Sequence, residues 1–392
     1  MRQFGLLLLV ACHHPQVDRG SSEPGPKMQR VRIATWNVSM YRSAQGELAD
    51  DLATGDDPQA RLIAQVLAEV RPDVLLLNEI DHDPAGRPVE LLADRYLAPA
   101  GLKLRYRLTP PVNTGVPSGL DLNGDGTISA PPGSREAAGD CWGYGVYPGQ
   151  YGLAVLSRFP LGEARTFRKL LWSSMPDNQL QGEPALYPPD VAAQVRLSSK
   201  THLDVRVDVG PGIHLLASHP TPPVFDGPED RNGRRNHDEL RLWSDYVSGQ
   251  SWMTDDAGRA GGLDGGPFVI LGDQNNDPFD GDGRHDAVLG LIAAAGRQPL
   301  DGPTSLGAPE SAALAPEANG AHTGPAAMDT IAIDTIGNLR LDYVLPSADL
   351  QVIAQGVYWP THDDPRFAAV GDKSPFPVSD HRLVWVDVVV PI

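Results

Sequence analysis

Acids, amides and histidines stand where several apolar, strand-like segments of this chain end. These are the side chains that bind hard divalent cations and that accept, donate or orient protons. A strand end is held by a stiff sheet, so functional groups are often placed there. The residues that share this placement are Asn37, Glu79, His219, Asp273, Asn275, Asp342, Asp380 and His381. Their types indicate a catalytic site to which several segments contribute.

Each of these residues has an ordinary structural explanation when it is taken alone. Asp380-His381 is common in solvated loops, and Gly272-Asp273-Gln274-Asn275 is a frequent turn sequence. Asp342 is different because it lies inside the strand-like segment 340–345, where a carboxylate is costly unless it is paired or hydrogen-bonded. The order of these residues along the chain is therefore more informative than any one of them.

Local patterns predict the elements that position these groups. Residues 31–37 alternate and are β-prone, which predicts a strand that ends in Asn37. Asp57-Pro58 supplies a cap and a first-turn proline for a helix that ends at residues 71–73. Val74–Leu77 is a continuous apolar run, which predicts a strand buried on both faces just before Glu79.

The rest of the chain continues this mixture. Strands are predicted at 151–157, near 191–198, and at 204–209, 213–218, 268–271, 341–345 and 383–390, with a helix at 237–249 that has Asp238 in its first turn. Helices mixed with an antiparallel hairpin indicate an α/β fold of two packed sheets flanked by helices. We expect one domain over residues 31–392, with loop insertions near 107–150, 220–236 and 302–330.

The order Asn, Glu, His, Asp-x-Asn, Asp, Asp-His resembles the endonuclease/exonuclease/phosphatase superfamily. That group includes pancreatic-type deoxyribonucleases, apurinic endonucleases, inositol-polyphosphate 5-phosphatases and neutral sphingomyelinases. The matching segments are residues 35–37, 72–79, 152–158, 271–275, 341–345 and 379–381. The resemblance implies a four-layer α/β/β/α sandwich with its site at one edge of the sheets. It also implies a metal-dependent enzyme that hydrolyses phosphoester bonds.

The resemblance assigns three residues to metal binding. Glu79 is the main metal carboxylate, Asn37 lies close by, and Asp380 is a further ligand. A hard cation with few protein ligands keeps several waters and meets phosphate oxygens directly. The expected ion is Mg²⁺, with Mn²⁺ as the alternative.

The resemblance assigns the remaining residues to the reaction. Asp273 orients and deprotonates the attacking water, and Asn275 positions a phosphate oxygen. Asp342 holds His381 through a carboxylate–imidazole hydrogen bond. His381 and His219 donate hydrogen bonds to the non-bridging oxygens as charge builds on phosphorus. Whether Asp273 or His381 is the base stays open.

Arginines follow His219 in a segment unlike the loops of deoxyribonucleases or apurinic endonucleases. Arg231, Arg234 and Arg235 stand close together in an acidic chain, which fits contact with one anionic group of a substrate. The alternative is a solvated run of charges that nearby acidic residues neutralise.

Residues 121–129 match the first nine positions of a calcium-binding loop. The oxygen-bearing positions are Asp121, Asn123, Asp125 and Thr127. The twelfth position, normally glutamate, is Pro132, so an ordinary EF-hand is not expected. Two interpretations stay open, a loop-stabilising Ca²⁺ and a cluster of turns rich in Gly and Asp.

Residues 1–12 have the pattern of a bacterial lipoprotein signal peptide, with one basic residue, an apolar run and then Leu9-Val10-Ala11-Cys12. The run is too short to span a bilayer as a helix. The lipobox-like end predicts lipid attachment at Cys12, with residues 13–30 as a flexible tether. We therefore expect an exported protein anchored to the cell envelope, at the outer membrane or facing the periplasm if the host is Gram-negative. The alternative is a mis-assigned start or a frayed apolar terminus.

Charge narrows the choice of substrate. A formal net charge of -18 disfavours a scanning nucleic-acid binder, because an acidic surface repels phosphate backbones at long range. The leading function is a phosphomonoesterase or phosphodiesterase, expected as a monomer, for a small or lipid-linked phosphoester. The first rival is an extracellular nuclease that scavenges nucleotides, since a bound metal can reverse the local field. The second is a non-catalytic surface lipoprotein that binds calcium or a partner, although the complete residue set counts against it.

Overall fold

Two mixed sheets form the centre of the protein. The computed structural model describes Met1 and residues 27–128, 130–371 and 373–392. Neighbouring strands of the first sheet are β12 (Gln351–Val357), β13 (Val384–Pro391), β1 (Met28–Met40), β2 (Val74–Ile80), β4 (Leu153–Ser157) and β3 (Tyr106–Leu108). Those of the second are β11 (Asp342–Pro346), β8 (Phe268–Asp273), β7 (Ile213–Ala217), β6 (Leu203–Val207) and β5 (Leu161–Thr166). A separate hairpin pairs β9 (Ile331–Ile333) with β10 (Gly337–Leu339).

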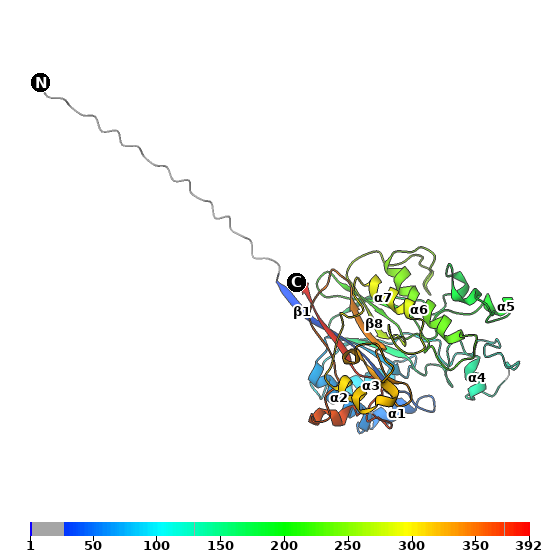
Figure 1. Ribbon diagram of the computed structural model, residues 1–392, viewed down its shortest axis with the longest axis horizontal. Coiled ribbons are helices and arrows are strands. Elements are labelled where there is room, and N and C mark those ends of the chain that lie inside the picture. Colours follow the sequence, from blue (N-terminus) through cyan, green and yellow to red (C-terminus); the bar gives the residue numbers. More distant parts are fainter. Residues whose placement is uncertain (2–26, 129, 372) are drawn as a thin grey trace.

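Helices cover the outer faces of the two sheets (Figure 1). The first sheet carries α1 (Glu47–Ala53), α2 (Pro58–Val70) and α3 (Arg87–Leu92), which continues as a π-helical turn over Ala93–Leu97. The second carries α6 (Arg231–Val247) and α7 (His285–Ala294). Shorter helices are α4 (Arg135–Gly139), α5 (Pro189–Ala192), α8 (Gly307–Leu314) and α9 (Pro316–Asn319). Single 3-10 turns occur at Trp172–Ser174, Gln179–Gln181, Ala326–Met328 and Pro365–Ala369. Within the described residues, no helix combines the length and the apolar character needed to cross a membrane.

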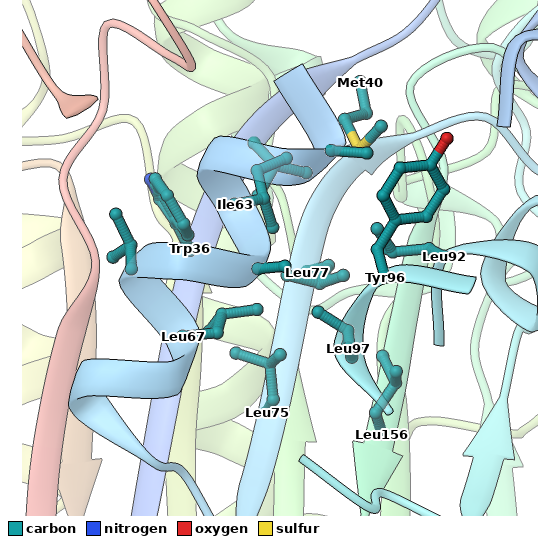
Figure 2. Close-up of a cluster of buried hydrophobic side chains, with 14 of the residues drawn as sticks. Trp36, Met40, Ile63, Leu67, Leu75, Leu77, Leu92, Tyr96, Leu97 and Leu156 are labelled. Atoms are coloured by element: carbon teal, nitrogen blue, oxygen red, sulfur yellow. The ribbon is translucent and has the colours of Figure 1, made fainter. Parts of the chain in front are cut away.

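The apolar run of β2 shows why the sheets pack in layers. Leu75 and Leu77 point outward and pack against α2, as Figure 2 shows for this cluster. Val74 and Leu76 point the other way, into a second core between the sheets. A third core packs β7, β8 and β11 against α6 and α7. Each fully buried leucine contributes about 1.5–3 kcal/mol, so both faces of β2 stabilise the fold. The predicted four-layer α/β/β/α sandwich is confirmed.

Several predicted boundaries differ from the structure. β1 begins at Met28 and pairs with β13, so the last residues of the predicted tether lie in a strand. The strand predicted near 191–198 is wrong, because Pro188-Pro189 starts the short helix α5 and only an isolated bridge at Arg196 follows. The predicted loop 302–330 contains α8 and α9, whose weak apolar pattern hides them in the sequence.

Helix α6 begins six residues before its predicted start at 237, at Arg231. Its first turns lack an apolar stripe, so the helical period of apolar residues did not predict them. Asp238 is therefore not in the first turn. It is fully buried, and its Oδ2 accepts hydrogen bonds from Trp172 Nε1 and Gln179 N, both at 2.6 Å. Residues 2–12 of the predicted signal peptide, including Cys12, lie outside the described residues. Cys141 is a free, buried thiol, and burial raises its pKa to about 11.

Candidate active site

The strand ends bring the predicted site residues to one edge of both sheets. In the second sheet β7 and β8 run parallel, so His219 follows one strand where Asp273 ends the other. β11 runs antiparallel to β8, and its first residue, Asp342, pairs directly with Asp273. In the first sheet, Asn37 of β1 lies beside the end of the parallel strand β2. The two sheets therefore contribute to a single cluster.

Asp273 is the centre of that cluster. Its side chain is 1% exposed, and its Oδ2 accepts a hydrogen bond from Asn37 Nδ2 at 3.0 Å. The Nε2 atoms of His219 and His381 lie 3.4 and 3.5 Å from the same oxygen. Its other oxygen accepts from the main-chain N of Asn275 at 3.0 Å. A carboxylate held between two imidazoles is well placed to hold or accept a proton.

His381 and Asp342 form a short, buried pair. His381 Nδ1 lies 2.7 Å from Asp342 Oδ2, which also accepts from Thr330 Oγ1 at 2.8 Å. Burial raises the pKa of Asp342 to about 6, while His381 opposes that rise. Burial by itself would lower the pKa of His381, but Asp342 and Asp273 hold it well above its usual value. This geometry is the one that the predicted orienting role of Asp342 requires.

His219 and Glu79 face the same space with opposite preferences. Burial, together with nearby Lys200 and His381, lowers the pKa of His219 well below its usual value. Burial also raises the pKa of Glu79 to about 7, and the charge of Asp273 adds to the rise. Glu79 Oε1 lies 3.9 Å from His219 Nε2. A carboxylate crowded by burial and a second acid is a group that a cation would stabilise.

Three side chains of the site stand on left-handed backbone. Ser39, Glu79 and Asn275 have φ angles of 46°, 58° and 53°. Such a conformation costs a non-glycine residue about 1–3 kcal/mol and persists only where the surroundings fix it. Asn37 Oδ1 accepts from Ser39 N at 3.1 Å, and the bond from Asn275 N to Asp273 fixes the second turn. Ser39 and Glu79 lie where the pairing of β1 with β2 shifts register, and Asn275 lies just after the end of β8.

A cavity of about 820 Å³ opens over this cluster. The predicted residues that line it are Glu79, His219, Asp273, Asn275, Asp380 and His381. Asn37 and Asp342 are buried behind them, at 1% exposure each, and hold Asp273 and His381 in place. The structure therefore brings all eight residues together, six at the cavity surface and two as supports.

Two groups of side chains could hold a metal. Asp273, Asp342 and His381 each offer a ligand atom within 4.8 Å of the others. The 2.7 Å contact between His381 and Asp342 is a hydrogen bond, however, so it already occupies one atom of each. Glu79 and Asp380 line the cavity and offer the carboxylate oxygens that Mg²⁺ prefers. The second group fits a hard divalent cation better.

Asn37 and Asp380 are placed differently from simple metal ligands. The Asn37 oxygen already accepts the hydrogen bond from Ser39 N, so a metal would have to share it. Among the described residues, Asp380 Oδ1 accepts from the hydroxyls of Ser39 and Ser379, at 3.3 and 3.4 Å. Asp380 is therefore the more available of the two, and the metal role of each stays a prediction.

The three arginines use their donors within the fold. Arg234 is 5% exposed and donates to the carbonyls of Glu183 and Pro184, both at 2.8 Å, and it does not line the cavity. Arg235 donates to three main-chain carbonyls, and Arg231 donates to Leu122 O at 2.7 Å. The structure thus does not bring Arg234 to the substrate space. Arg231 and Arg235 do line it, Arg235 with three of its donors bound to carbonyls and Arg231 with one.

The calcium-like loop is organised by its own backbone. Both Asp121 oxygens accept main-chain N–H groups, from residues 124 to 126. Asn123 Oδ1 accepts from Asp125 N at 2.9 Å, and Asp125 Oδ1 accepts from Thr127 N at 2.7 Å. These bonds match the alternative of a turn cluster, and calcium binding stays a prediction.

The sequence patterns did not predict four buried residues of the site. Asn78 Oδ1 accepts from Asp273 N at 3.2 Å, so it bridges the two sheets. Thr330 donates to Asp342, as described above. Lys200 lines the cavity. Glu239 of α6 accepts hydrogen bonds from the main-chain N of Ser199, beside Lys200, and of Thr221, in the loop after His219. Asn78 adjoins a predicted residue, but nothing local marks the other three because their partners are distant in sequence.

Comparison with known proteins gives a family match over most of the chain. Residues 34–381 match the family described as "Endonuclease/Exonuclease/phosphatase family". No curated protein matches the chain. Among solved structures, an endonuclease/exonuclease/phosphatase from Beutenbergia cavernae DSM 12333 is 20% identical with a TM-score of 0.48, covering 92% of this chain and 72% of that one.

Two further solved structures have different printed activities. Sphingomyelinase C from Streptomyces griseocarneus is 14% identical with a TM-score of 0.45, covering 92% of this chain and 99% of its own. A 3'-5' exonuclease from Neisseria meningitidis is 14% identical with a TM-score of 0.43, covering 91% and 98%. At these scores the similarities do not discriminate between substrates.

Proposed function

The chain belongs to the endonuclease/exonuclease/phosphatase family and is a metal-dependent hydrolase of phosphoester bonds, and on that premise we propose that it cleaves a small or lipid-linked phosphoester. One observation carries the proposal. The Asp273 cluster lies in a cavity that has an aliphatic and an aromatic wall beside its polar residues. Such walls bind apolar substituents by removing their surface from water. The substrate is therefore one phosphate ester with apolar groups on either side.

The aliphatic wall begins beside the reacting groups. It is formed by the hairpin and its flanks, with Ile331, Ile333, Ile336, Leu339 and Leu341. Ile331 forms a β-bridge with His381, and Ala332 N donates to Asp380 O at 3.2 Å. The hairpin is thus attached directly to the segment that carries His381. An apolar substituent on the phosphate would contact this surface.

An aromatic wall lies on another side of the cavity. Tyr41, Tyr144 and Tyr151 line it, and the rings of Tyr41 and Tyr151 are 4.6 Å apart between centroids. Tyr144 is 53% exposed, so part of this surface is open to solvent. Aromatic faces bind flat or aliphatic groups and tolerate many shapes.

The charges of the cavity argue against a polyanionic substrate. The acidic residues that line it are Glu79, Asp273, Asp277, Asp280, Asp282 and Asp380. Its basic side chains are Lys200, Arg231 and Arg235, beside His381. Arg235 already donates to three main-chain carbonyls, and Arg231 donates to one. A nucleic-acid strand would therefore meet carboxylates without a basic groove, which disfavours the nuclease alternative.

The side chains divide the reaction among them. A divalent cation held by Glu79, with Asp380 and Asn37 near, would neutralise the phosphate and polarise its bonds. Asp273 holds the attacking water and accepts its proton, while Asn37 Nδ2 and the main-chain N of Asn275 fix its carboxylate. As the water oxygen bonds to phosphorus, the ester P–O bond breaks and the alcohol leaves. His381, kept protonated by Asp342, donates to a non-bridging oxygen. Asn275 donates to another oxygen from its left-handed turn.

We propose Mg²⁺ or Mn²⁺ as the ion, and a monomer anchored to a membrane through Cys12. The choice of ion rests on the oxygen ligands of the site, and the anchor rests on the lipobox-like sequence. Calcium at residues 121–127 is a separate, structural proposal.

The decisive test of the function is hydrolysis of bis- and mono-p-nitrophenyl phosphate beside plasmid nicking. EDTA should abolish hydrolysis, and Mg²⁺ or Mn²⁺ should restore it. Glu79→Gln should raise the metal concentration needed while the fold survives, since the change is nearly isosteric. As a control, Glu163→Gln changes a glutamate that is 75% exposed and should behave as the native protein does. EDTA-resistant hydrolysis by Glu79→Gln would sink the metal assignment, and plasmid nicking without ester hydrolysis would favour the nuclease.

A further inference from the structure

Lys200 is a buried cation that the reaction described above does not use. It lies just before β6, its residue is 7% exposed, and it lines the catalytic cavity. Its Nζ donates to Pro220 O at 3.2 Å. An ammonium group has three N–H donors, and this bond is the one that Nζ makes within the described residues.

The position of Lys200 is costly for the fold. Across the described part of the chain, no carboxylate oxygen lies within 4.0 Å of Nζ, so the ammonium has no ion pair. A buried charge without a close counter-ion is destabilising by several kcal/mol. Burial accordingly lowers the pKa of Lys200, although Glu239, Glu79 and Asp273 oppose that effect. A cation kept at such a cost beside a phosphate site needs a reason other than stability.

The backbone on both sides of Lys200 is held rigidly. Glu239 Oε1 accepts from Ser199 N at 2.6 Å, and the carbonyl of Lys200 accepts from Asn113 N at 2.9 Å. Gly143 packs so closely that an added Cβ would lie 1.8 Å from Ser199 O. The main chain of this segment therefore has little freedom to move Nζ away from the cavity.

The groups around Lys200 point to a phosphate oxygen as its ligand. Lys200 Nζ donates to the carbonyl of Pro220, the residue after His219, and both Lys200 and His219 line the cavity, so the two lie on the same part of it. Glu239 Oε2 also accepts from Thr221 N at 2.6 Å, so one carboxylate holds both the Lys200 segment and the loop after His219. The family resemblance assigns His219 to an oxygen of the reacting phosphate. A neighbouring ammonium with unused donors suits another oxygen of that phosphate.

We propose that Lys200 binds a non-bridging oxygen of the substrate phosphate and stabilises the charge that builds on it during hydrolysis. The inference rests on the proposed function, because it needs a phosphoester in this cavity. It adds a cation to the transition state beyond the divalent metal and His381. It also explains why an ion-pair partner is missing, since the phosphate itself is the partner.

The test compares Lys200→Met, Lys200→Arg and the control Lys103→Met, which removes an exposed lysine. Three quantities are measured for each: kcat and KM on bis-p-nitrophenyl phosphate with Mg²⁺, the inhibition constant of inorganic phosphate, and Tm. Lys200→Met should lower kcat by about 10²-fold, the usual loss for one charge-stabilising donor. Its inhibition constant for inorganic phosphate should rise by roughly tenfold or more. Its Tm should equal or exceed the native value, because an unpaired buried charge is removed.

The conservative change and the control separate catalysis from structure. Lys200→Arg keeps the charge and should retain part of the phosphate affinity, and Lys103→Met should match the native protein. Native kcat and phosphate inhibition in Lys200→Met would overturn the proposal. A large fall in Tm in Lys200→Met, with activity lost in proportion, would assign a structural role instead. If the native protein hydrolyses no phosphoester at all, the proposed function fails, and that result is distinct from an active protein that ignores Lys200.

Discussion

Glu239 offers a sharp test of how α6 supports the active site. It is fully buried, and its two oxygens accept three hydrogen bonds, from Ser199 N, Ser199 Oγ and Thr221 N at 2.6, 2.9 and 2.6 Å. Glu239→Gln keeps the shape of the side chain but turns one acceptor into an NH₂ donor. That donor must face either the Ser199 or the Thr221 N–H group. One of the two segments therefore loses its anchor.

The size of the effect follows from these contacts. A hydrogen bond to a charged group contributes about 1.5–3 kcal/mol, and an unsatisfied buried N–H costs about 1–3 kcal/mol more. Removing a buried charge returns part of this loss, because the carboxylate no longer has to be desolvated. We expect a net destabilisation of about 2–4 kcal/mol, or roughly 3–5 °C in Tm for a chain of this length. Since a shift of about 1 Å in a catalytic group can cost 10²-fold, kcat should fall at least about tenfold.

Urea unfolding and steady-state kinetics check both parts of this expectation. Glu163→Gln is the matched control, because its partner Arg259 and Glu163 itself are largely exposed, and a surface pair of this kind contributes about 0–1 kcal/mol. If Glu239→Gln unfolds at the native urea concentration and keeps native kcat, the reasoning about this clamp is wrong. A loss of stability with unchanged kcat would keep the clamp but separate it from catalysis.

Other predictions concern single groups. Asp342→Asn should lower kcat by about 10²–10⁴-fold because His381 loses its partner, and a native rate would show that the pair is dispensable. Burial raises the pKa of Asp329 from 3.8 to about 8. Between these two pH values, the folded protein keeps a proton that the unfolded chain has lost. The contribution of Asp329 to stability should therefore fall as pH rises through that window, by at most about 1.4 kcal/mol per unit, and Asp329→Asn should reduce the difference between the urea midpoints at pH 5 and 8. Arg234→Ala should lower Tm and change KM equally for large and small substrates. A rise in KM for large substrates alone would instead support the contact between Arg234 and the substrate. Cys12→Ser should abolish palmitate labelling and release the protein from membranes, and unchanged membrane binding would contradict the anchor.

The polar residues at the strand ends could be found in the sequence for a physical reason. Each follows an apolar run whose period reports burial, and burial depends on side chains that are close in sequence. Val74–Leu77 predicted a strand buried on both faces, and the structure divides its side chains between two cores. The order of polar residues from Asn37 to His381 then indicated the family and the sandwich fold.

The limits of α6 show where such local patterns fail. Its first turns carry arginines and no apolar stripe, so the sequence indicated a loop whose arginines either contact the substrate or form a solvated charge run. In the structure Arg234 binds the carbonyls of Glu183 and Pro184, about 50 residues away in the chain. Those partners have no sequence signature, because a main-chain carbonyl belongs to every residue.

The sequence alone therefore determined which residues could do chemistry, since residue type and local period are local properties. The tertiary structure decided how they act. Asp342 is 39 residues from His381, and Glu239 is 40 residues from Ser199, so both pairings depend on how the sheets and α6 pack. The raised pKa of Glu79 and the cost of burying Lys200 arise from neighbours on separate strands and from the exclusion of water. Burial and electrostatic coupling are sums over distant segments, and only the folded chain brings those segments together.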